Sequence, residues 1–522
     1  MNKRIKYTLA TVFATLALTS CYEDKGNYDY TEAEQITGTG FPESMSVVQK
    51  SDYIELSPSF TSNLSGAIDN NPNYEFSCLL WKSGGTFSDT RTRQKEIDVD
   101  HAKDVKYFAD LTEGNYVIQY MVTNKATGVT TNFKVPVSVT SATYEGWMVL
   151  CDDAEGYARM DMVSVLSATR KEAVHDILGT NAPKLRGART MMMNAYPSNY
   201  YSGDGLWYST NDGTYSLNAS TLTSAYNVAE NEFIVTPKDE KVLITDGLYM
   251  GTRLCITDKG TIYCKSSSSG ACYEDPINTF TDGGNPDFHA APFIGVTMAR
   301  PDYYNQKAIL YDTDHQQFLS WDGSYYGKHN ICSTIKDPEN KLFSYKTGKD
   351  IVAMVNTKFS GSTIYSVLQD AVGQRTVYGI NLTGGQIVQS LYEPVSAPGF
   401  DKATTFAFHS QYPYMFYNNG DKVYSYHLIN HTANVGITLS DEEVTMVKFN
   451  LFYHAPGATF NKSDEFMAQQ YMLIVGSYKK NSTDGNGGVL RFYKFDQATG
   501  SLTLTDTYEG FGKIKDVMYR ER

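Results

Sequence analysis

One short pattern recurs between Glu145 and the C-terminus, roughly every 50 to 60 residues and about seven times. Each copy is an apolar strand, a tight polar turn and a second strand that carries an aromatic residue. Clear copies run from Leu206 to Tyr215, from Leu254 to Tyr263 and from Tyr414 to Tyr424. A repeat of this length holds about four short strands, and a single hairpin pair cannot bury both of its faces alone. The repeat therefore predicts a β-propeller of about seven blades over residues 143–522.

A ring of blades needs its two ends joined. Residues 513–519 form one more alternating strand after the seventh copy of the pattern. We expect this strand to pair with the blade that begins near Trp147, because that pairing removes the open edges of the first and last sheets. The alternative is two or more separate sandwiches, which the even spacing and the lack of a linker between copies disfavour.

Residues 41–142 carry a different pattern, in which short alternating strands are separated by turns about every ten residues. Gly114–Asn124 is followed by a turn at Ala126–Gly128 and by Thr131–Val139, where valines alternate with polar residues. Alternation of this kind is typical of an antiparallel β-sandwich of about 100 residues. The hairpin resembles the last strands of PKD and immunoglobulin-like modules. The predicted fold is thus all-β, with an Ig/PKD-like β-sandwich before the propeller.

Residues 1–20 have the three-part layout of a secretory signal, with basic residues first and an apolar run from Leu9 to Leu18. That run is too short to remain in a bilayer as a spanning helix. The stretch Leu18–Cys21 resembles a bacterial lipobox, in which a leucine and two small residues precede the cysteine. We therefore expect residues 1–20 to be a lipoprotein signal peptide and Cys21 to be the lipidated residue.

Glu23 and Asp24, close behind Cys21, resemble the surface-export signal of Bacteroidota lipoproteins, although an ordinary solvated linker also has such residues. Residues 21–40 are polar and contain glycine, with no periodic pattern, and they predict a flexible tether. No second stretch of the sequence is long and apolar enough to span a membrane. We therefore expect the lipid on Cys21 to be the anchor.

The formal charge of the chain is −13, and the segment expected to be removed contains basic residues and no acidic ones. The mature protein is then more acidic still. Such a charge disfavours nucleic acid and anionic lipid head groups as partners. We expect contact with the membrane through the lipid anchor alone.

Six cysteines follow Cys21, and none of them has the C-x-x-C spacing of a zinc ribbon or a thioredoxin-type motif. A two-residue turn at Lys259-Gly260 would place Cys255 directly opposite Cys264 on neighbouring strands. The spacing therefore allows a cross-strand disulfide between these two residues. Two reduced, half-buried cysteines fit it equally well.

No motif for catalysis is present: the sequence has no G-x-S-x-G elbow, no H-E-x-x-H helix and no phosphate-binding loop. We therefore expect no catalytic residues, no metal site and no cofactor. One enzymatic alternative stays open, because Asp and Glu are plentiful. The paired carboxylates of a glycoside hydrolase cannot be placed without a fold.

Aromatic residues in polar segments between predicted strands are the remaining signal for binding. Such rings stack on sugars or hold peptide side chains with little loss of entropy. Packing between blades is the alternative role for the same rings. The candidate ligand-binding residues are Tyr200, Tyr201, Tyr303, Tyr304, Trp321, Tyr325 and Tyr326.

Taken together, the lipobox with Tyr22–Tyr28, the PKD-like strands and the degenerate repeat resemble the PKD-like surface lipoproteins of Bacteroidota. The resemblance implies an accessory lipoprotein without catalytic activity, held at the outer membrane and facing the cell exterior.

Its implied partners are a TonB-dependent transporter and its lid lipoprotein, in an importer of the Sus type. It would help capture or deliver oligomeric nutrients, with oligopeptides slightly favoured over oligosaccharides. A surface hydrolase or lyase that acts on glycan and a purely structural subunit of the importer are the alternatives.

Overall fold

The computed structural model divides into two compact units, Met1–Thr140 and Ser141–Arg522. The described residues are 32–49, 51–83, 97–100, 102–166, 170–179, 182–194, 205–218, 222–248, 252–265, 272–281, 285–298, 306–324, 327–451 and 467–520.

The first unit is a β-sandwich built mainly on one five-stranded sheet. Its strand order is β2 (Met45–Val48), β10 (Thr130–Thr140), β9 (Gly114–Asn124), β6 (Tyr74–Lys82) and β7 (Ile97–Asp100). Two smaller sheets contain β1 (Ile36–Thr39), β4 (Ser59–Ser62) and β5 (Gly66–Ala67), and β3 (Tyr53–Leu56) with β8 (Val105–Phe108). All pairs in the large sheet are antiparallel except β2 with β10, which are parallel.

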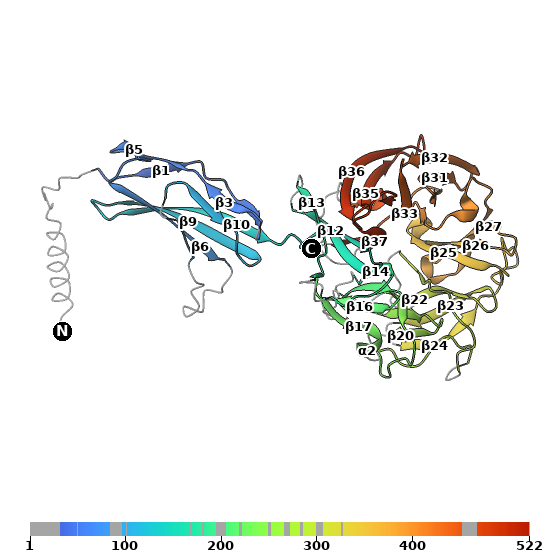
Figure 1. Ribbon diagram of the computed structural model, residues 1–522. Helices are drawn as coiled ribbons and strands as arrows, with labels where there is room; N and C mark the ends of the chain where they lie inside the picture. The colour runs from blue at the N-terminus through green and yellow to red at the C-terminus, as the bar shows by residue number, and fades with distance from the viewer. Residues whose placement is uncertain are drawn as a thin grey trace, which may run out of the picture. The chain divides into compact units, whose positions relative to one another are not determined.

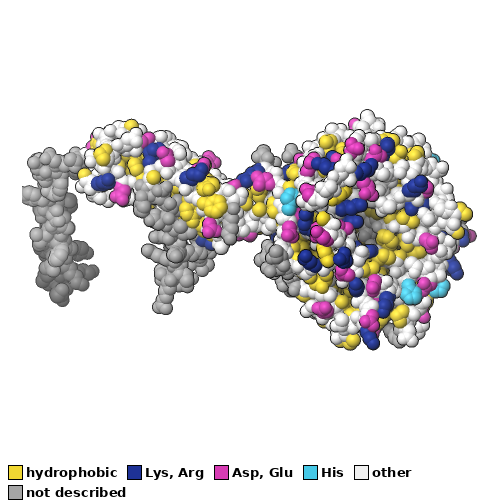
Figure 2. All heavy atoms as spheres, in the orientation of Figure 1, with side chains coloured by type: hydrophobic (Ala, Val, Ile, Leu, Met, Phe, Trp, Pro, Cys, Tyr) yellow, Lys and Arg dark blue, Asp and Glu magenta, His cyan; other side chains and the backbone are white. Residues whose placement is uncertain are grey.

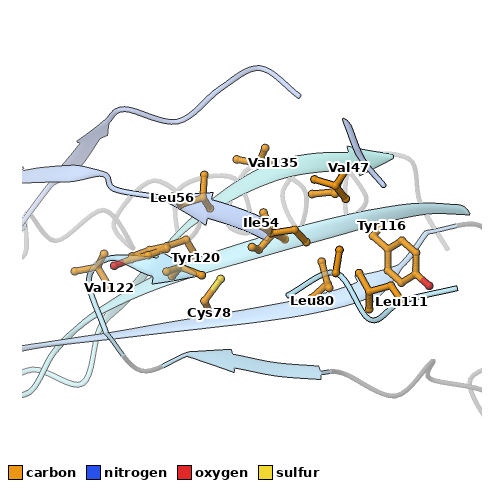
Figure 3. Packing of buried hydrophobic residues seen from close by; sticks show 14 of the residues in the cluster. Val47, Ile54, Leu56, Cys78, Leu80, Leu111, Tyr116, Tyr120, Val122 and Val135 are labelled. Atoms are coloured by element: carbon orange, nitrogen blue, oxygen red, sulfur yellow. The ribbon is translucent and has the colours of Figure 1, made fainter. Parts of the chain in front are cut away.

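Alternation along the strands gives this sandwich its core (Figure 3). In β9, Tyr116, Ile118 and Tyr120 are buried while the residues between them are not. Ile54 and Leu56 of β3 join the same buried cluster from another sheet. Burying such an apolar side chain contributes about 1.5–3 kcal/mol, so this pattern holds the sheets together.

The second unit is a β-propeller, and its described residues form seven sheets arranged in a ring (Figure 1). The first three sheets contain β13 (Lys171–Val174), β12 (Ala158–Val165), β11 (Gly146–Asp152) and β37 (Lys513–Arg520); β14 (Ala188–Asn194), β15 (Gly205–Thr210), β16 (Gly213–Leu217) and β17 (Ser224–Asn227); and β18 (Val242–Gly247), β19 (Arg253–Thr257) and β20 (Ile262–Lys265).

The fourth and fifth sheets contain β21 (Gly295–Val296), β22 (Gln306–Asp312), β23 (Gln317–Ser324) and β24 (Gly327–Thr334), then β25 (Asp350–Thr357), β26 (Thr363–Gln369), β27 (Arg375–Asn381) and β28 (Val388–Pro394). The last two contain β29 (Phe406–Phe408), β30 (Tyr414–Asn419), β31 (Lys422–His427) and β32 (Thr432–Thr438), then β33 (Glu442–Lys448), β34 (Leu473–Lys479), β35 (Gly488–Phe495) and β36 (Leu502–Phe511). One short helix, α2 (Val228–Asn231), follows β17. The all-β prediction of a sandwich and a propeller of about seven blades is confirmed.

The C-terminal strand closes the ring as predicted. β37 pairs with β11 antiparallel, with Trp147 opposite Tyr519. The two rings meet edge to face with their centroids 4.9 Å apart, and Phe492 of β35 also lies 4.9 Å from Trp147. The first sheet therefore contains strands from both ends of the propeller, which leaves neither end with an unpaired innermost edge.

A bulge recurs in the innermost strands of the ring. In five of them the pairing register skips one residue, and the skipped residues are Arg189, Leu243, Val352, Thr445 and Lys515. A bulge bends its strand and turns a side chain away from the regular alternation. Two of the skipped residues, Arg189 and Lys515, line a cavity within the ring.

Candidate functional site

A cavity of about 400 Å³ lies within the ring, lined by residues in or beside the innermost strand of every sheet. Much of its lining is thioether: seven methionines contribute to it, which are Met191, Met192, Met193, Met298, Met354, Met446 and Met518. Phe293, Phe406 and Phe449 add aromatic surface. Figure 2 shows hydrophobic side chains and Lys and Arg side chains together on the propeller face turned to the viewer. The cavity therefore combines adaptable apolar walls with charged groups.

Asp516 is the most highly bonded of the charged groups. Its Oδ2 accepts hydrogen bonds from Thr190 Oγ1 at 2.9 Å and from the Met191 backbone N–H at 2.7 Å. Its Oδ1 accepts from Lys448 Nζ at 2.6 Å and from the Val517 N–H at 2.9 Å. These donors come from β14, β33 and β37, so a single carboxylate joins three neighbouring sheets where the ring closes. With four donors, this carboxylate has little capacity left for a ligand.

Asp246, near the end of β18, is bonded differently. Its Oδ1 accepts one hydrogen bond, from the Gly247 N–H at 2.7 Å. The side chain is half-buried and lines the cavity. Burial raises the pKa of Asp246 from its ordinary 3.8 to about 7, against the smaller opposing effects of the Gly247 N–H and the Lys448 charge. Near neutral pH, this carboxyl is therefore close to the midpoint of its titration.

Three cations border the same space. Lys448 holds Asp516 and keeps about a third of its side chain exposed. Arg189 donates from Nη1 to the Asn211 side-chain oxygen at 3.2 Å, and burial lowers the pKa of its guanidinium. Lys515 lies 3.4 Å from the Asp152 carboxylate. The lining thus offers charges of both signs to a ligand.

The structure overturns the prediction that Trp321 binds a ligand. Trp321 lies within β23 and is fully buried, in a core cluster with Leu319, Cys332 and Ala308. It is a packing residue because β23 is a middle strand of its sheet, covered on both faces. The Trp321 side chain therefore has the alternative role, which is packing between blades.

The other predicted ligand-binding residues lie outside the described residues. These are Tyr200, Tyr201, Tyr303, Tyr304, Tyr325 and Tyr326. The predicted lipidation site Cys21 and the export signal Glu23 and Asp24 also lie outside them.

The predicted pairing of Cys255 with Cys264 is wrong. The register places Cys255 opposite Tyr263, and Cys264 opposite Leu254. The two thiols do not face each other, because they lie in different buried clusters on opposite faces of the sheet. Burial also raises the pKa of the Cys255 thiol well above its ordinary value, which makes it less reactive.

A three-residue loop is the reason for this shift of register. Thr257 N–H donates to Thr261 O, so the loop spans residues 258–260 in place of the two-residue turn expected from Lys259-Gly260. Gly260 has a φ of +73°, the left-handed conformation that commonly ends such loops. One extra loop residue moves every partner by one position and turns Cys264 to the other face.

Sequence reasoning did not find Asp246, Lys448 or Asp516. One signal was present: each is a charged residue at or near apolar residues of an innermost strand, as in Val517-Met518-Tyr519 after Asp516. Charged residues are rarely buried without a partner, so these positions indicate a site. These three residues line the same cavity because the blades close into a ring.

In sequence, residues 21–184 match the model of the PKD-like family. The match covers the sandwich and the beginning of the propeller. No curated protein matches the chain. Within the part of the chain that the structure describes, no helix is long and apolar enough to cross a membrane, and no group of three His, Cys, Asp or Glu residues could hold a metal ion.

Solved structures resemble the chain at low sequence identity. A quinonprotein alcohol dehydrogenase-like protein from Bacteroides thetaiotaomicron is 13% identical with a TM-score of 0.42, over 94% of this chain and 100% of that one. A protein from Lactobacillus plantarum is 12% identical with a TM-score of 0.46, over 72% and 99%. The WD40 domain of SCAP from fission yeast is 11% identical with a TM-score of 0.34, over 62% and 74%.

Proposed function

We propose that this protein is a non-catalytic binding lipoprotein of the outer-membrane surface, which captures oligomeric nutrients in the axial cavity of its propeller. The observation that carries the proposal is the cavity itself, with its thioether and aromatic walls and its charges of both signs. Its volume lies within the range of about 300–1,000 Å³ that is usual for ligand sites.

The composition of the walls favours peptides over sugars. Methionine side chains are flexible and polarizable, so a surface rich in them adapts to ligands of different shape. Peptides vary in their side chains and carry charged ends, which suit a cavity bordered by Asp246 and Lys448. Sugar sites more often present broad aromatic faces, whereas three of the five aromatic side chains of this lining, Phe406, Phe408 and Tyr519, are buried.

The state of the carboxylates supports binding rather than hydrolysis. Glycoside hydrolysis needs two carboxyl groups that are free to act as acid, base or nucleophile. Asp516 is engaged by four donors, including the Lys448 ammonium at 2.6 Å. This leaves Asp246 as a single available carboxyl among the described lining residues.

The proposed location and partners rest on the N-terminal sequence and on the family match. The lipobox at Cys21 and the acidic residues Glu23 and Asp24 support a lipid anchor and export to the surface. The match of residues 21–184 to the PKD-like family supports the resemblance on which the partners depend. These partners are a TonB-dependent transporter and its lid lipoprotein, to which the protein delivers its ligand.

Retention with recovery of the ligand tests this function. The full chain is incubated with tryptic peptides of casein and, separately, with maltooligosaccharides, and the retained molecules are identified by mass spectrometry. We expect peptides to be retained and recovered at unchanged mass. New, shorter products would contradict a non-catalytic role, and no retention of either mixture would contradict capture. Purification of the lipoprotein from outer membranes should also bring the transporter with it, and its absence would remove the proposed partners.

A further inference from the structure

We infer that the ligand of the axial cavity carries an ammonium group and that the Asp246 carboxylate receives it. This inference rests on the proposed capture function and names the chemistry of the ligand. It places the anchor at the end of β18, where Asp246 lines the cavity.

The other carboxylates of the structure provide the first argument. Each one that is buried among the described residues lies within 4 Å of a Lys, Arg or His side chain. The pairs are Asp161–Arg159, Glu232–Lys265, Asp312–His315, Glu393–His431, Glu442–Arg491 and Asp516–Lys448. In four of these pairs the partner is a Lys or Arg cation, and in two it is a His ring, so each buried carboxylate has a basic side chain beside it.

Asp246 is half-buried at the wall of the cavity and lacks such a partner. Within the described part of the chain it has no ion pair, and its one hydrogen bond comes from the neighbouring Gly247 N–H. A carboxylate has about four acceptor positions, so about three remain unused. The charge of Lys448 acts on Asp246, but the Lys448 ammonium is already held 2.6 Å from Asp516. The cation that would complete Asp246 is therefore one that enters the cavity.

The remaining groups of the lining fit the rest of such a ligand. Lys448 has three N–H donors and uses one on Asp516, which leaves donors for a carbonyl or carboxylate oxygen. The methionines adapt to the side chain between the two ends. A free α-amino group or a lysine side chain of a short peptide meets these requirements, and a neutral sugar does not.

Blocking the amino groups tests the inference. The full chain is mixed with tryptic peptides of casein and with the same peptides after acetylation of their amines. Ultrafiltration and mass spectrometry then compare the two. We expect free-amine peptides to be retained at least about tenfold better than acetylated ones. Asp246→Asn should abolish that preference, while Asp401→Asn, a matched change at an exposed aspartate, should keep it.

The outcomes separate the inference from the proposed function. Equal retention of acetylated and free peptides, or an unchanged preference in Asp246→Asn, overturns the role of Asp246 but leaves capture intact. Retention of maltooligosaccharides but not of peptides would likewise overturn the role of Asp246 and leave capture intact. If neither peptides nor maltooligosaccharides are retained, both the inference and the proposed function fail. Circular dichroism of each variant shows whether it is folded before its binding is compared.

Discussion

Lys448 Nζ lies 2.6 Å from Asp516 Oδ1, and this ion pair joins the innermost strand of the last sheet to the strand that closes the ring. The same carboxylate accepts the Met191 N–H of the next sheet, so the contact extends across three sheets. Asp516 is only 5% exposed, which makes the pair sensitive to the loss of either partner. Closure of the propeller and the shape of its cavity therefore depend on the same residue.

The first prediction concerns this residue. Asp516→Asn removes the buried negative charge that Lys448 faces and leaves the half-buried Lys448 ammonium without its counter-ion. We expect a loss of about 2–4 kcal/mol in the free energy of unfolding, measured by urea denaturation. Asp401→Asn, at an exposed position, should change it by less than about 0.5 kcal/mol. Equal denaturation midpoints for the two variants would show that the pair does not stabilise the ring.

The second prediction concerns the pH dependence that Asp246 adds to stability. Its folded pKa, about 7, is raised above its ordinary value of 3.8, so the folded state binds this proton more tightly than the unfolded state. The resulting stability is fully present below pH 4 and is lost as the pH rises through 7. Asp246→Asn removes this dependence.

Thermal unfolding at several pH values measures the effect. The melting temperature of Asp246→Asn relative to the wild type should rise between pH 5 and pH 8, by about 2–5 °C. A constant difference over that range would mean that the pKa of Asp246 is not raised in the folded protein.

The third prediction concerns the cysteines of the third sheet. Because Cys255 and Cys264 face opposite sides of the sheet, they cannot form a disulfide with each other without a change of register. Alkylation in denaturant, without any reductant, should label both thiols. A tryptic peptide pair linked through these two residues would contradict the register.

The fourth prediction concerns Trp321. Because the side chain is fully buried, Trp321→Ala should lower the free energy of unfolding by about 3–5 kcal/mol. Val372→Ala, at a valine that is 88% exposed, is the control and should have little effect. Weaker ligand retention by Trp321→Ala without loss of stability would contradict a purely structural role for this ring.

Much of the fold was accessible from the sequence because its signals are local and repeated. The recurring hairpin predicts the blades, and the alternation in residues 513–519 predicts the closing strand. The turn at Lys259-Gly260 shows the limit of such reasoning. Gly260 can end a two-residue or a three-residue loop, and the local sequence suits both. The loop length nevertheless decides which face of the sheet Cys264 occupies.

The cavity was not accessible in the same way. Lys448 and Asp516 are 68 positions apart, and Asp246 belongs to a third sheet. No local pattern brings these residues together, since their meeting depends on the number of blades and on ring closure. Trp321 shows a different error. Its segment contains Gly and Tyr residues and therefore resembles a loop in composition, but Trp321 lies within strand β23.

If the ligand binds in the axial cavity as proposed, a side chain that fills the cavity should prevent binding. Filling it is the most direct test, with Ile244→Trp and Val355→Trp, which each add an indole to the lining, and Val388→Trp as a control on an exposed outer strand. Isothermal titration with tryptic peptides of casein should show binding by the wild type and by Val388→Trp. Both cavity variants should lose at least about tenfold in affinity while they remain folded. Unchanged affinity in both of them would contradict the claim.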